Sequence, residues 1–344
     1  RSMAKYLEIA EILKNRIEHG DYLNSPMPGE RKIADEIGVS YMTARKAIRH
    51  LIDAGVIGKA EDGKAQLPKS EALYANCAFL APAFASLQTI RWQMALDQTL
   101  NRSGRLLRSA YFVHWDDLAI AETLANFDLV FLLPKLETPP ERLLRKLADS
   151  GKPVIVLESD WSERGFLSIL SSPVEAIDRL LELLAEGDAP VDCFNSQPLD
   201  DIIEARLAQW EKFPHRGRCF NYPINFYGET LPHTCRVASG LLREGSWEPR
   251  AVFCTTLSAA IGLNRVFTEF GLQVGRDVKL AAVNGEDWAP YLTPSITALA
   301  NADLNALVAR ALELLRTGGA PVCLKPARLE VLPGESTAGF HQLS

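Results

Sequence analysis

One short segment of the sequence, residues 38–57 (GVSYMTARKAIRHLIDAGVI), combines a helical apolar pattern with clustered cations. Its apolar side chains recur at the i, i+3, i+4, i+7 spacing of a buried stripe, which comprises Ala44, Ala47, Ile48 and Leu51. Tyr41, Arg45 and Arg49 then fall on the outer face, with Lys46 beside them. Guanidinium groups bind phosphates and guanine edges, so such a face suits the major groove of DNA. The alternative for any single helix is an ordinary solvated charged face, and the neighbouring segments decide between the two.

Two further helices and a hairpin are predicted around this segment. Apolar residues at helical spacing mark both helices, and these are Ile9, Leu13, Ile17, Ile33, Ala34 and Ile37. Gly20 and Gly38 end the two helices, and Ser40 is a favourable N-cap for the third. Residues 56–67 then predict two short strands around a tight turn at Asp62 and Gly63. Three helices followed by a hairpin are the elements of a winged helix-turn-helix, which favours DNA binding over the solvated face.

The composition is that of a globular protein with more than one domain. The chain has 344 residues, which exceeds one ordinary core. It has no apolar run of the roughly 20 residues that span a bilayer. The 6 cysteines are scattered without a Cys-x-x-Cys pair, which predicts no disulfide framework and a cytoplasmic location. Residues 1–70 contain 12 Lys and Arg against 10 Asp and Glu, whereas the remainder contains 25 against 33. A slightly basic head on an acidic body is compatible with a local DNA-binding surface.

The segment MPGERKIADEIGVSYMTARKAIRHLIDAGVI closely resembles the GntR-type winged helix, over about residues 5–68. The resemblance implies DNA contacts by Arg31, Thr43 and Arg45, with Tyr41 standing where an arginine is usual. The wing tip, residues 62–65, also departs from the family's Gly-x-Gly pattern. The full set of residues expected to contact DNA is Arg31, Ser40, Tyr41, Thr43, Arg45, Lys46, Arg49, Lys59, Gly63 and Lys64.

Beyond residues 69–73, which are interpreted as a linker, short apolar strands alternate with helices. This alternation predicts an α/β body of doubly wound parallel sheets, whose sites lie at the carboxyl ends of the strands. Because about 270 residues are too many for one such sheet, two lobes are expected. Residues 1–68 form the winged helix and 74–344 the body in this interpretation. The first lobe is predicted to comprise about residues 74–169 and 290–318, and the second about 170–289 and 319–344.

The stretch EPRAVFCTTLSAAIGLNRVFTEFGLQVGRDVKLAAVNGEDWAPYLTPSITALAN resembles the LacI/GalR-type effector domain, a periplasmic-binding-protein-like fold. The resemblance covers about residues 74–340 and implies a homodimer that binds a carbohydrate-like effector. The residues that it implies as effector contacts are Glu158, Arg206, Thr255, Asn284 and Asn301. Trp92 is a further candidate because indole rings stack on ligands, although a core position is the commoner role of a tryptophan.

The effector site departs from the family pattern in its charges. Thr255-Thr256 stand in place of Asn-Asp, and Asn284-Gly285 in place of Asp-Asp. Because aspartates are the strongest acceptors for sugar hydroxyls, a typical aldohexose is doubtful. Arg206 is suited to a carboxylate or a phosphate, and the alternative is an internal ion pair in a degenerate cleft.

Other chemistry finds little support in the sequence. His215, Cys219, His233 and Cys235 match no usual metal spacing, and carboxylate pairs such as Asp116-Asp117 and Asp200-Asp201 suit helix caps. No phosphate-binding loop, nucleophile elbow or zinc-protease motif is present, so neither an enzyme, a metal nor a cofactor is predicted. The sequence therefore predicts a transcription regulator that acts as a repressor. Its expected partners are operator DNA, an effector and a second copy of the chain, and no membrane is expected. A solute-binding protein and a ligand-independent DNA-binding scaffold are the alternatives.

Overall fold

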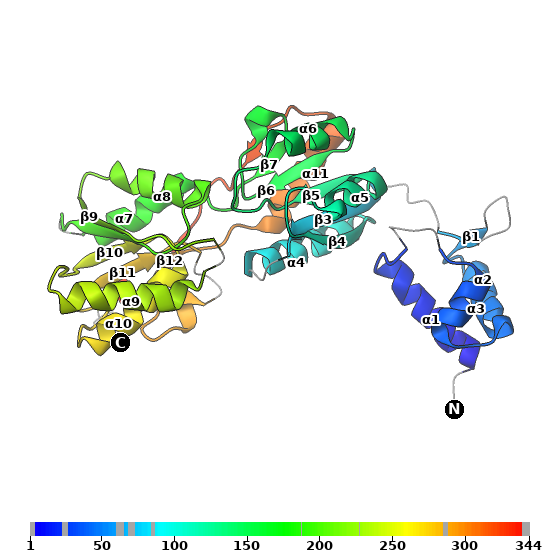
Figure 1. Ribbon diagram of the computed structural model, residues 1–344, viewed down its shortest axis with the longest axis horizontal. Helices are drawn as coiled ribbons and strands as arrows, with labels where there is room; N and C mark the ends of the chain where they lie inside the picture. The colour runs from blue at the N-terminus through cyan, green and yellow to red at the C-terminus, as the bar shows by residue number, and fades with distance from the viewer. Residues whose placement is uncertain are drawn as a thin grey trace. The chain divides into compact units, whose positions relative to one another are not determined.

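The computed structural model describes residues 4–22, 27–59, 65–67, 73–83, 87–186, 188–226, 228–284 and 288–338. The head contains three helices, α1 (Lys5–Glu18), α2 (Glu30–Ile37) and α3 (Tyr41–Asp53), and the antiparallel pair β1 (Gly58–Lys59) and β2 (Ala65–Gln66) (Figure 1). One apolar cluster holds the three helices together, with Leu13, Ile33 and Ala44 fully buried in it. The predicted winged helix-turn-helix is confirmed.

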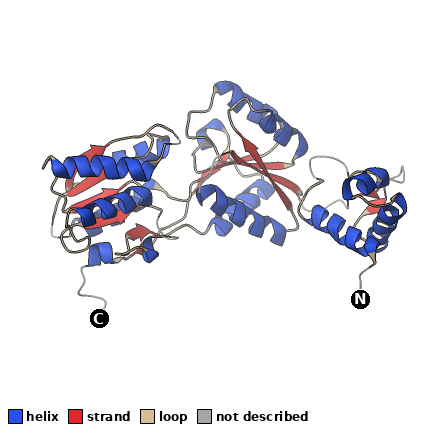
Figure 2. Ribbon diagram, turned by 60° about the horizontal axis from the view of Figure 1, so that its bottom comes forward, coloured by secondary structure: helices blue, strands red, loops and turns tan. Residues whose placement is uncertain are grey.

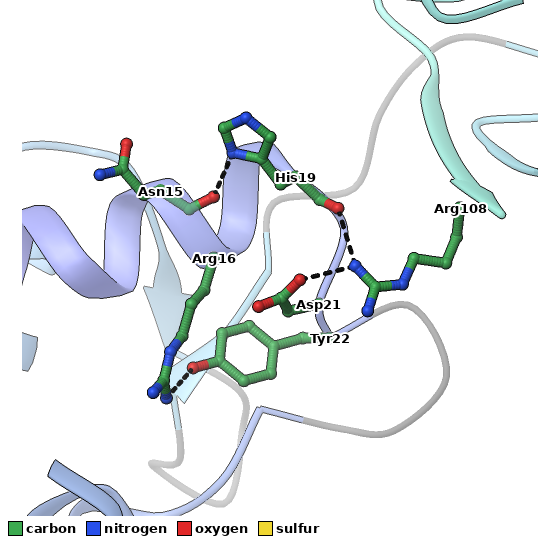
Figure 3. Close-up of polar contacts among 6 residues, drawn as sticks. All are labelled: Asn15, Arg16, His19, Asp21, Tyr22 and Arg108. Carbon is green, nitrogen blue, oxygen red and sulfur yellow. Dashed lines mark hydrogen bonds and ion pairs between the residues drawn. The ribbon is translucent and has the colours of Figure 1, made fainter. Parts of the chain in front are cut away.

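Polar contacts fix the end of α1, and Figure 3 shows them. Arg16 donates to the Tyr22 hydroxyl at 3.4 Å. Arg108, on an edge strand of the first sheet of the body, donates to Asp21 Oδ1 at 2.7 Å and to the His19 carbonyl at 3.4 Å. The side chains of the Arg108–Asp21 ion pair are 41% and 38% exposed. Exposed ion pairs contribute about 0–1 kcal/mol, so this contact adds little to stability.

The first sheet of the body has the strand order β13-β7-β6-β5-β3-β4. Its strands are β3 (Asn76–Pro82), β4 (Leu106–Phe112), β5 (Leu129–Leu132), β6 (Val154–Leu157), β7 (Leu167–Ile169) and β13 (Cys323–Leu324). The pairs from β4 to β7 are parallel. The helices that belong to this lobe are α4 (Leu87–Arg102), α5 (Leu118–Asn126), α6 (Glu141–Asp149) and α11 (Leu304–Thr317), with a short turn η1 (Ser162–Arg164). The near-continuous burial of β3, β5 and β6 is typical of parallel strands that are covered on both faces.

The second sheet has the order β14-β12-β11-β10-β8-β9. Its strands are β8 (Val191–Asn195), β9 (Arg216–Asn221), β10 (Ala251–Cys254), β11 (Lys279–Ala282), β12 (Thr297–Leu299) and β14 (Val331–Leu332), of which β14 alone among these is antiparallel to its neighbour. Its helices are α7 (Asp178–Leu184), α8 (Asp201–Glu211), α9 (Thr230–Arg243), α10 (Leu257–Glu269) and α12 (Glu335–Ala338), with turns η2 (Val174–Ile177) and η3 (Ala289–Tyr291). Figure 2 shows helices on both faces of each sheet, so the predicted doubly wound architecture is confirmed.

The chain passes between the lobes three times. One compact unit comprises residues 1–169 and 304–323, and the other comprises 170–303 and 324–344. The return to the first lobe, predicted at about residue 290, instead follows residue 303, and the return to the second, predicted at about residue 319, follows residue 323. Strand β12 pairs with β11 and therefore belongs to the second sheet, so the chain leaves that lobe only after residue 303.

Close packing of α9 on α10 depends on a glycine. A Cβ atom at Gly262 would lie 2.6 Å from Thr234 Cγ2 and 2.7 Å from Thr234 Cβ. Thr234 cannot turn aside cheaply, because its hydroxyl bonds Ser196 at 2.6 Å and the Thr230 carbonyl at 2.9 Å. The two helices therefore approach each other where one of them has no side chain.

We expect Gly262→Ala to lower the free energy of unfolding of the second lobe by about 1–3 kcal/mol, because the added methyl group overpacks this contact. Gly240→Ala, in the interior of α9, is the matched control. A Cβ atom there meets nothing within 4 Å. The control should raise stability by about 0.5–1 kcal/mol through helix propensity. Urea unfolding of the full-length variants measures both effects, and equal stability of the two would contradict the packing argument.

Candidate functional site

The rotation of α3 about its axis is set by its cap and its buried stripe. Ser40 Oγ accepts a hydrogen bond from the Thr43 backbone N–H at 3.2 Å, and Gly38 closes α2 in the left-handed region at φ 73°. The predicted stripe is confirmed as buried, with Ala44 and Ala47 fully so. Ser40 and Thr43 also bond each other through their hydroxyls at 2.8 Å. The first turn of the helix is therefore fixed before any ligand is present.

The cations that are predicted to contact DNA and that the structure describes all have exposed side chains. These residues are Arg31, Arg45, Lys46, Arg49 and Lys59. None of these five forms an ion pair with another residue in the described part of the chain. Their charge is thus available to a polyanion, and phosphate contacts by such side chains supply most of the affinity for DNA. Gly63 and Lys64 lie outside the described residues.

Two residues of this surface were not predicted from the sequence. Met42 lies in the first turn of α3 and is 56% exposed, beside Tyr41 at 40%. Glu30 begins α2, and its carboxylate beside the Tyr41 hydroxyl raises the pKa of that phenol. The helical spacing is compatible with an outward Met42, but an apolar side chain gives no sequence signal for DNA binding.

In the first lobe, the structure brings Trp92 and Glu158 together. Trp92 Nε1 donates to Glu158 Oε1 at 2.9 Å. The Trp92 side chain is fully buried and Glu158 is 6% exposed. Glu158 follows β6 directly and has a left-handed backbone, with φ 60°. A non-glycine residue held in this region is typical of sites whose geometry is over-determined by their surroundings.

In the second lobe, Arg206 and Thr255 are in contact. The Arg206 side chain is 4% exposed, and its guanidinium donates to the Thr255 carbonyl at 2.7 Å. Burial raises the pKa of Asp200, while the backbone N–H of Ile203 and the nearby Arg206 oppose that rise. Asp200 also caps α8 by accepting from the Ile203 N–H at 2.7 Å, as its position beside a turn predicts. Arg206 therefore joins α8 to the end of β10 through a backbone carbonyl.

Amide side chains at the carboxyl ends of β8 and β9 extend this polar group, and the sequence did not reveal them. Asn195 accepts from the Thr255 hydroxyl at 2.7 Å and donates to Asn221 Oδ1 at 2.9 Å. Gln197 donates to Thr256 Oγ1 at 3.0 Å. All five residues follow or end parallel strands of one sheet, which is where ligands bind in open α/β folds.

The remaining predicted effector residues follow the next strands of the same sheet. Asn284 lies two residues after β11, is exposed and has φ 63°. Asn301 lies two residues after β12 and is half-buried. Trp288 is 53% exposed. The strand ends of the second lobe thus carry amide and hydroxyl side chains, and the buried Arg206 contacts the end of β10 among them.

The carboxylates and possible metal ligands considered in the sequence have other contacts or are dispersed among the described residues. No group of three His, Cys, Asp or Glu side chains there could hold a metal ion. Asp117 caps α5 by accepting from the Ala119 N–H at 3.0 Å, and Asp116 forms an ion pair with Arg142. Within the same residues, no helix is both long enough and apolar enough to cross a membrane.

Comparisons with known proteins identify both parts of the chain. Residues 5–63 match the family described as bacterial regulatory proteins, gntR family, and residues 195–333 match the periplasmic binding protein-like domain. The HTH-type transcriptional repressor NagR of Bacillus subtilis (strain 168) is 38% identical over 53 residues. That match covers 15% of this chain and 22% of NagR, so the chain spans much less than two thirds of this relative.

Solved structures of similar fold extend over most of the chain. A Lac repressor bound to ONPG in the repressed state has a TM-score of 0.63 at 16% identity, covering 88% of this chain and 98% of that one. The transcription regulator GntR from Chromobacterium violaceum has a TM-score of 0.60 at 19% identity, covering 77% and 100%. A LacI family regulator from Arthrobacter sp. FB24, in complex with lactose, has a TM-score of 0.61 at 15% identity, covering 76% and 99%.

At these identities the solved structures establish the fold alone, whereas the head and residues 195–333 of the body are also matched by sequence. The chain therefore joins a winged helix-turn-helix head that matches the gntR family to a body that matches the periplasmic binding protein-like domain and has the fold seen in the Lac repressor structure.

Proposed function

We propose that the protein is a DNA-binding transcription regulator, acting as a repressor, whose operator affinity is controlled by a small molecule. The observation that carries the proposal is the exposed cationic face of α3 on a GntR-type head. Arg45 and Arg49 project from the side opposite the buried stripe and have no ion-pair partner in the described part of the head. A helix of this kind enters the major groove, where its first residues reach base edges.

The proposed effector is a polar, carbohydrate-like molecule. The strand ends of the second lobe offer amide and hydroxyl groups, which form hydrogen bonds with sugar hydroxyls. A LacI family regulator of similar fold is known in complex with lactose. In this chain, Thr255-Thr256 stand where that family has Asn-Asp, and Asn284-Gly285 stand where it has Asp-Asp. We therefore propose that these two strand ends contact the effector through uncharged groups.

The proposed functional unit is a homodimer formed through the first lobe. Strand β4 is an edge strand, and α4 lies beside it, with the Tyr111 hydroxyl donating to Gln93 Oε1 at 3.3 Å. Exposed apolar side chains gather on these elements and on α5, namely Ile90, Met94, Tyr111, Val113 and Leu118, at 48–75% exposure. Apolar patches of this kind mark association surfaces, and a second copy of the same face is the simplest partner.

Two heads on one dimer make DNA affinity depend on their spacing. Half-sites lie one helical turn or a multiple apart, so a change in dimer geometry changes how both heads fit. We propose that the dimer exists in two geometries, of which one fits the operator. An effector shifts the equilibrium between them only if its affinities for the two geometries differ.

A ligand-independent DNA-binding scaffold is the second candidate. The observation that favours it is the internal engagement of Arg206 with Thr255 and of Trp92 with Glu158. A thermal-shift screen of sugars, sugar acids and sugar phosphates separates the two candidates. A ligand at about 100 times its Kd stabilises by about 2.7 kcal/mol, whereas a scaffold shows no stabilisation by any compound.

We expect Arg45→Ala to weaken binding to a duplex selected from a random-sequence library by about 1–3 kcal/mol, because a base-edge or phosphate contact is lost. Arg265→Ala is the control, since Arg265 lies in α10 and pairs with Glu269. It removes the same charge outside the head and should leave affinity unchanged. Fluorescence anisotropy measures both, and unaltered binding by Arg45→Ala would refute the assignment of α3 as the recognition helix.

We expect Asn284→Gly to weaken effector binding by about 0.5–1.5 kcal/mol through loss of one hydrogen bond. Glycine adopts the left-handed backbone of this position without strain, so stability should not fall. Asp188→Gly is the control at another exposed residue with φ 60°. Calorimetric titration with a compound found in the screen gives the affinities. Equal affinity in Asn284→Gly and the unaltered chain would remove Asn284 from the site.

We expect Met94→Glu to shift the protein from dimer to monomer at micromolar concentration, because the charge would be buried without a partner in the interface. Phe270→Glu, at an exposed apolar residue after α10, should leave the dimer intact. Sedimentation velocity distinguishes the species. A dimer that survives Met94→Glu and dissociates in Phe270→Glu would place the interface elsewhere.

A further inference from the structure

The first turn of α3 presents an apolar surface, although the rest of the exposed face is cationic. Tyr41 is 40% exposed and Met42 is 56% exposed. Both belong to the turn that Ser40 caps, so their Cα positions are fixed by the same hydrogen bonds that fix the helix. In a recognition helix, this first turn is the part that reaches deepest toward base edges.

A carboxylate lies beside this apolar surface. Glu30 is close enough to the Tyr41 hydroxyl to raise the pKa of the phenol, whereas Arg31 and Arg45 act on that hydroxyl in the opposite direction. The hydroxyl therefore faces an acceptor of the protein itself. Guanine presents two acceptors, N7 and O6, in the major groove, and a carboxylate next to them is unfavourable.

The remaining partner that suits an apolar side chain in the major groove is the C5-methyl group of thymine. A thioether and a phenol ring can both bury such a methyl group by apolar contact. Arg31 and Arg45 flank the turn and remain available for phosphates or for neighbouring bases.

We propose that Met42 and the ring of Tyr41 read a thymine in each operator half-site through its C5-methyl group. The inference rests on the proposed DNA-binding function and names the base that this part of the site selects. Arg45 and Arg49 then supply affinity, and the first turn of α3 supplies discrimination at one base pair.

The test begins with duplexes selected by the full-length protein from a random-sequence library. Each thymine of the selected half-site is then replaced singly by deoxyuridine, which lacks only the methyl group. We expect one replacement per half-site to weaken binding about four-fold, the effect of burying one methyl group. That sensitivity should disappear in Met42→Ala or Tyr41→Ala, whose side chains are exposed and whose folding is checked by circular dichroism.

A variant with altered preference gives a second readout. Tyr41→Arg should select guanine at the same position, because arginine binds N7 and O6 together. Arg49→Ala is the matched control, which should lower affinity for all duplexes and keep the deoxyuridine effect.

The outcomes distinguish a failure of the proposed DNA-binding function from a failure of the proposed thymine contact. If no sequence is enriched, the proposed function itself fails, and this inference with it. If a sequence is enriched but no deoxyuridine replacement matters, or the effect persists in Met42→Ala and Tyr41→Ala, the inference is overturned and the regulator remains. Enrichment of cytosine at this position would also overturn it, because the cytosine amino group would then donate to Glu30.

Discussion

The function of the head depends on how α3 is rotated about its own axis. Burial of its stripe, in which Ala44 and Ala47 are fully inaccessible, decides which side chains face outward. The stripe consists partly of alanines, so α1 and α2 approach the helix closely and little freedom remains in its orientation. Arg45 and Arg49 need no partner within the head to be held outward, since the packing on the opposite side does this. A cationic surface is therefore a consequence of the apolar core beneath it.

The body follows a different rule, in which backbone position gathers the polar groups. Parallel strands end on one edge of each sheet, so residues distant in sequence become neighbours there. Asn195, Asn221 and Thr255 meet in this way in the second lobe. Glu158 in the first lobe and Asn284 in the second both have left-handed backbones just beyond a strand. Such positions turn the chain sharply away from the sheet and aim a polar side chain at a fixed point, which suits a recognition surface better than a flexible loop does.

The parts of the fold that could be predicted from the sequence are those whose signals are local. Ser40 and Gly38 mark helix boundaries by their own chemistry, and the buried strands β5, β6 and β10 are nearly continuous apolar runs. Strand β9 has the sequence RGRCFN and lies at a sheet edge, so its polar residues show no strand pattern. Strand β12 has only three residues, so the sequence did not predict it. The predicted return of the chain to the first lobe was therefore placed before this strand. In the site, Arg206 and Thr255 were found through family resemblance, whereas Asn195 and Gln197 depend on which strands lie adjacent. Adjacency of strands is a property of topology that no local pattern contains.

The three passages of the chain between lobes govern the order in which the molecule can be made. The first lobe includes α11 and β13, and these come from residues that follow the whole of the second lobe up to residue 303. On the ribosome, the edge of β7 accordingly stays without its outer neighbour until residues 323–324 have been translated. The second lobe, by contrast, has all but its last strand and helix in one uninterrupted stretch. The first lobe is completed by α11 and β13, and the second only afterwards by β14 and α12. Exposed strand edges on nascent chains invite aggregation, so the edges of β7 and β12 are the ones that most need protection by chaperones during synthesis.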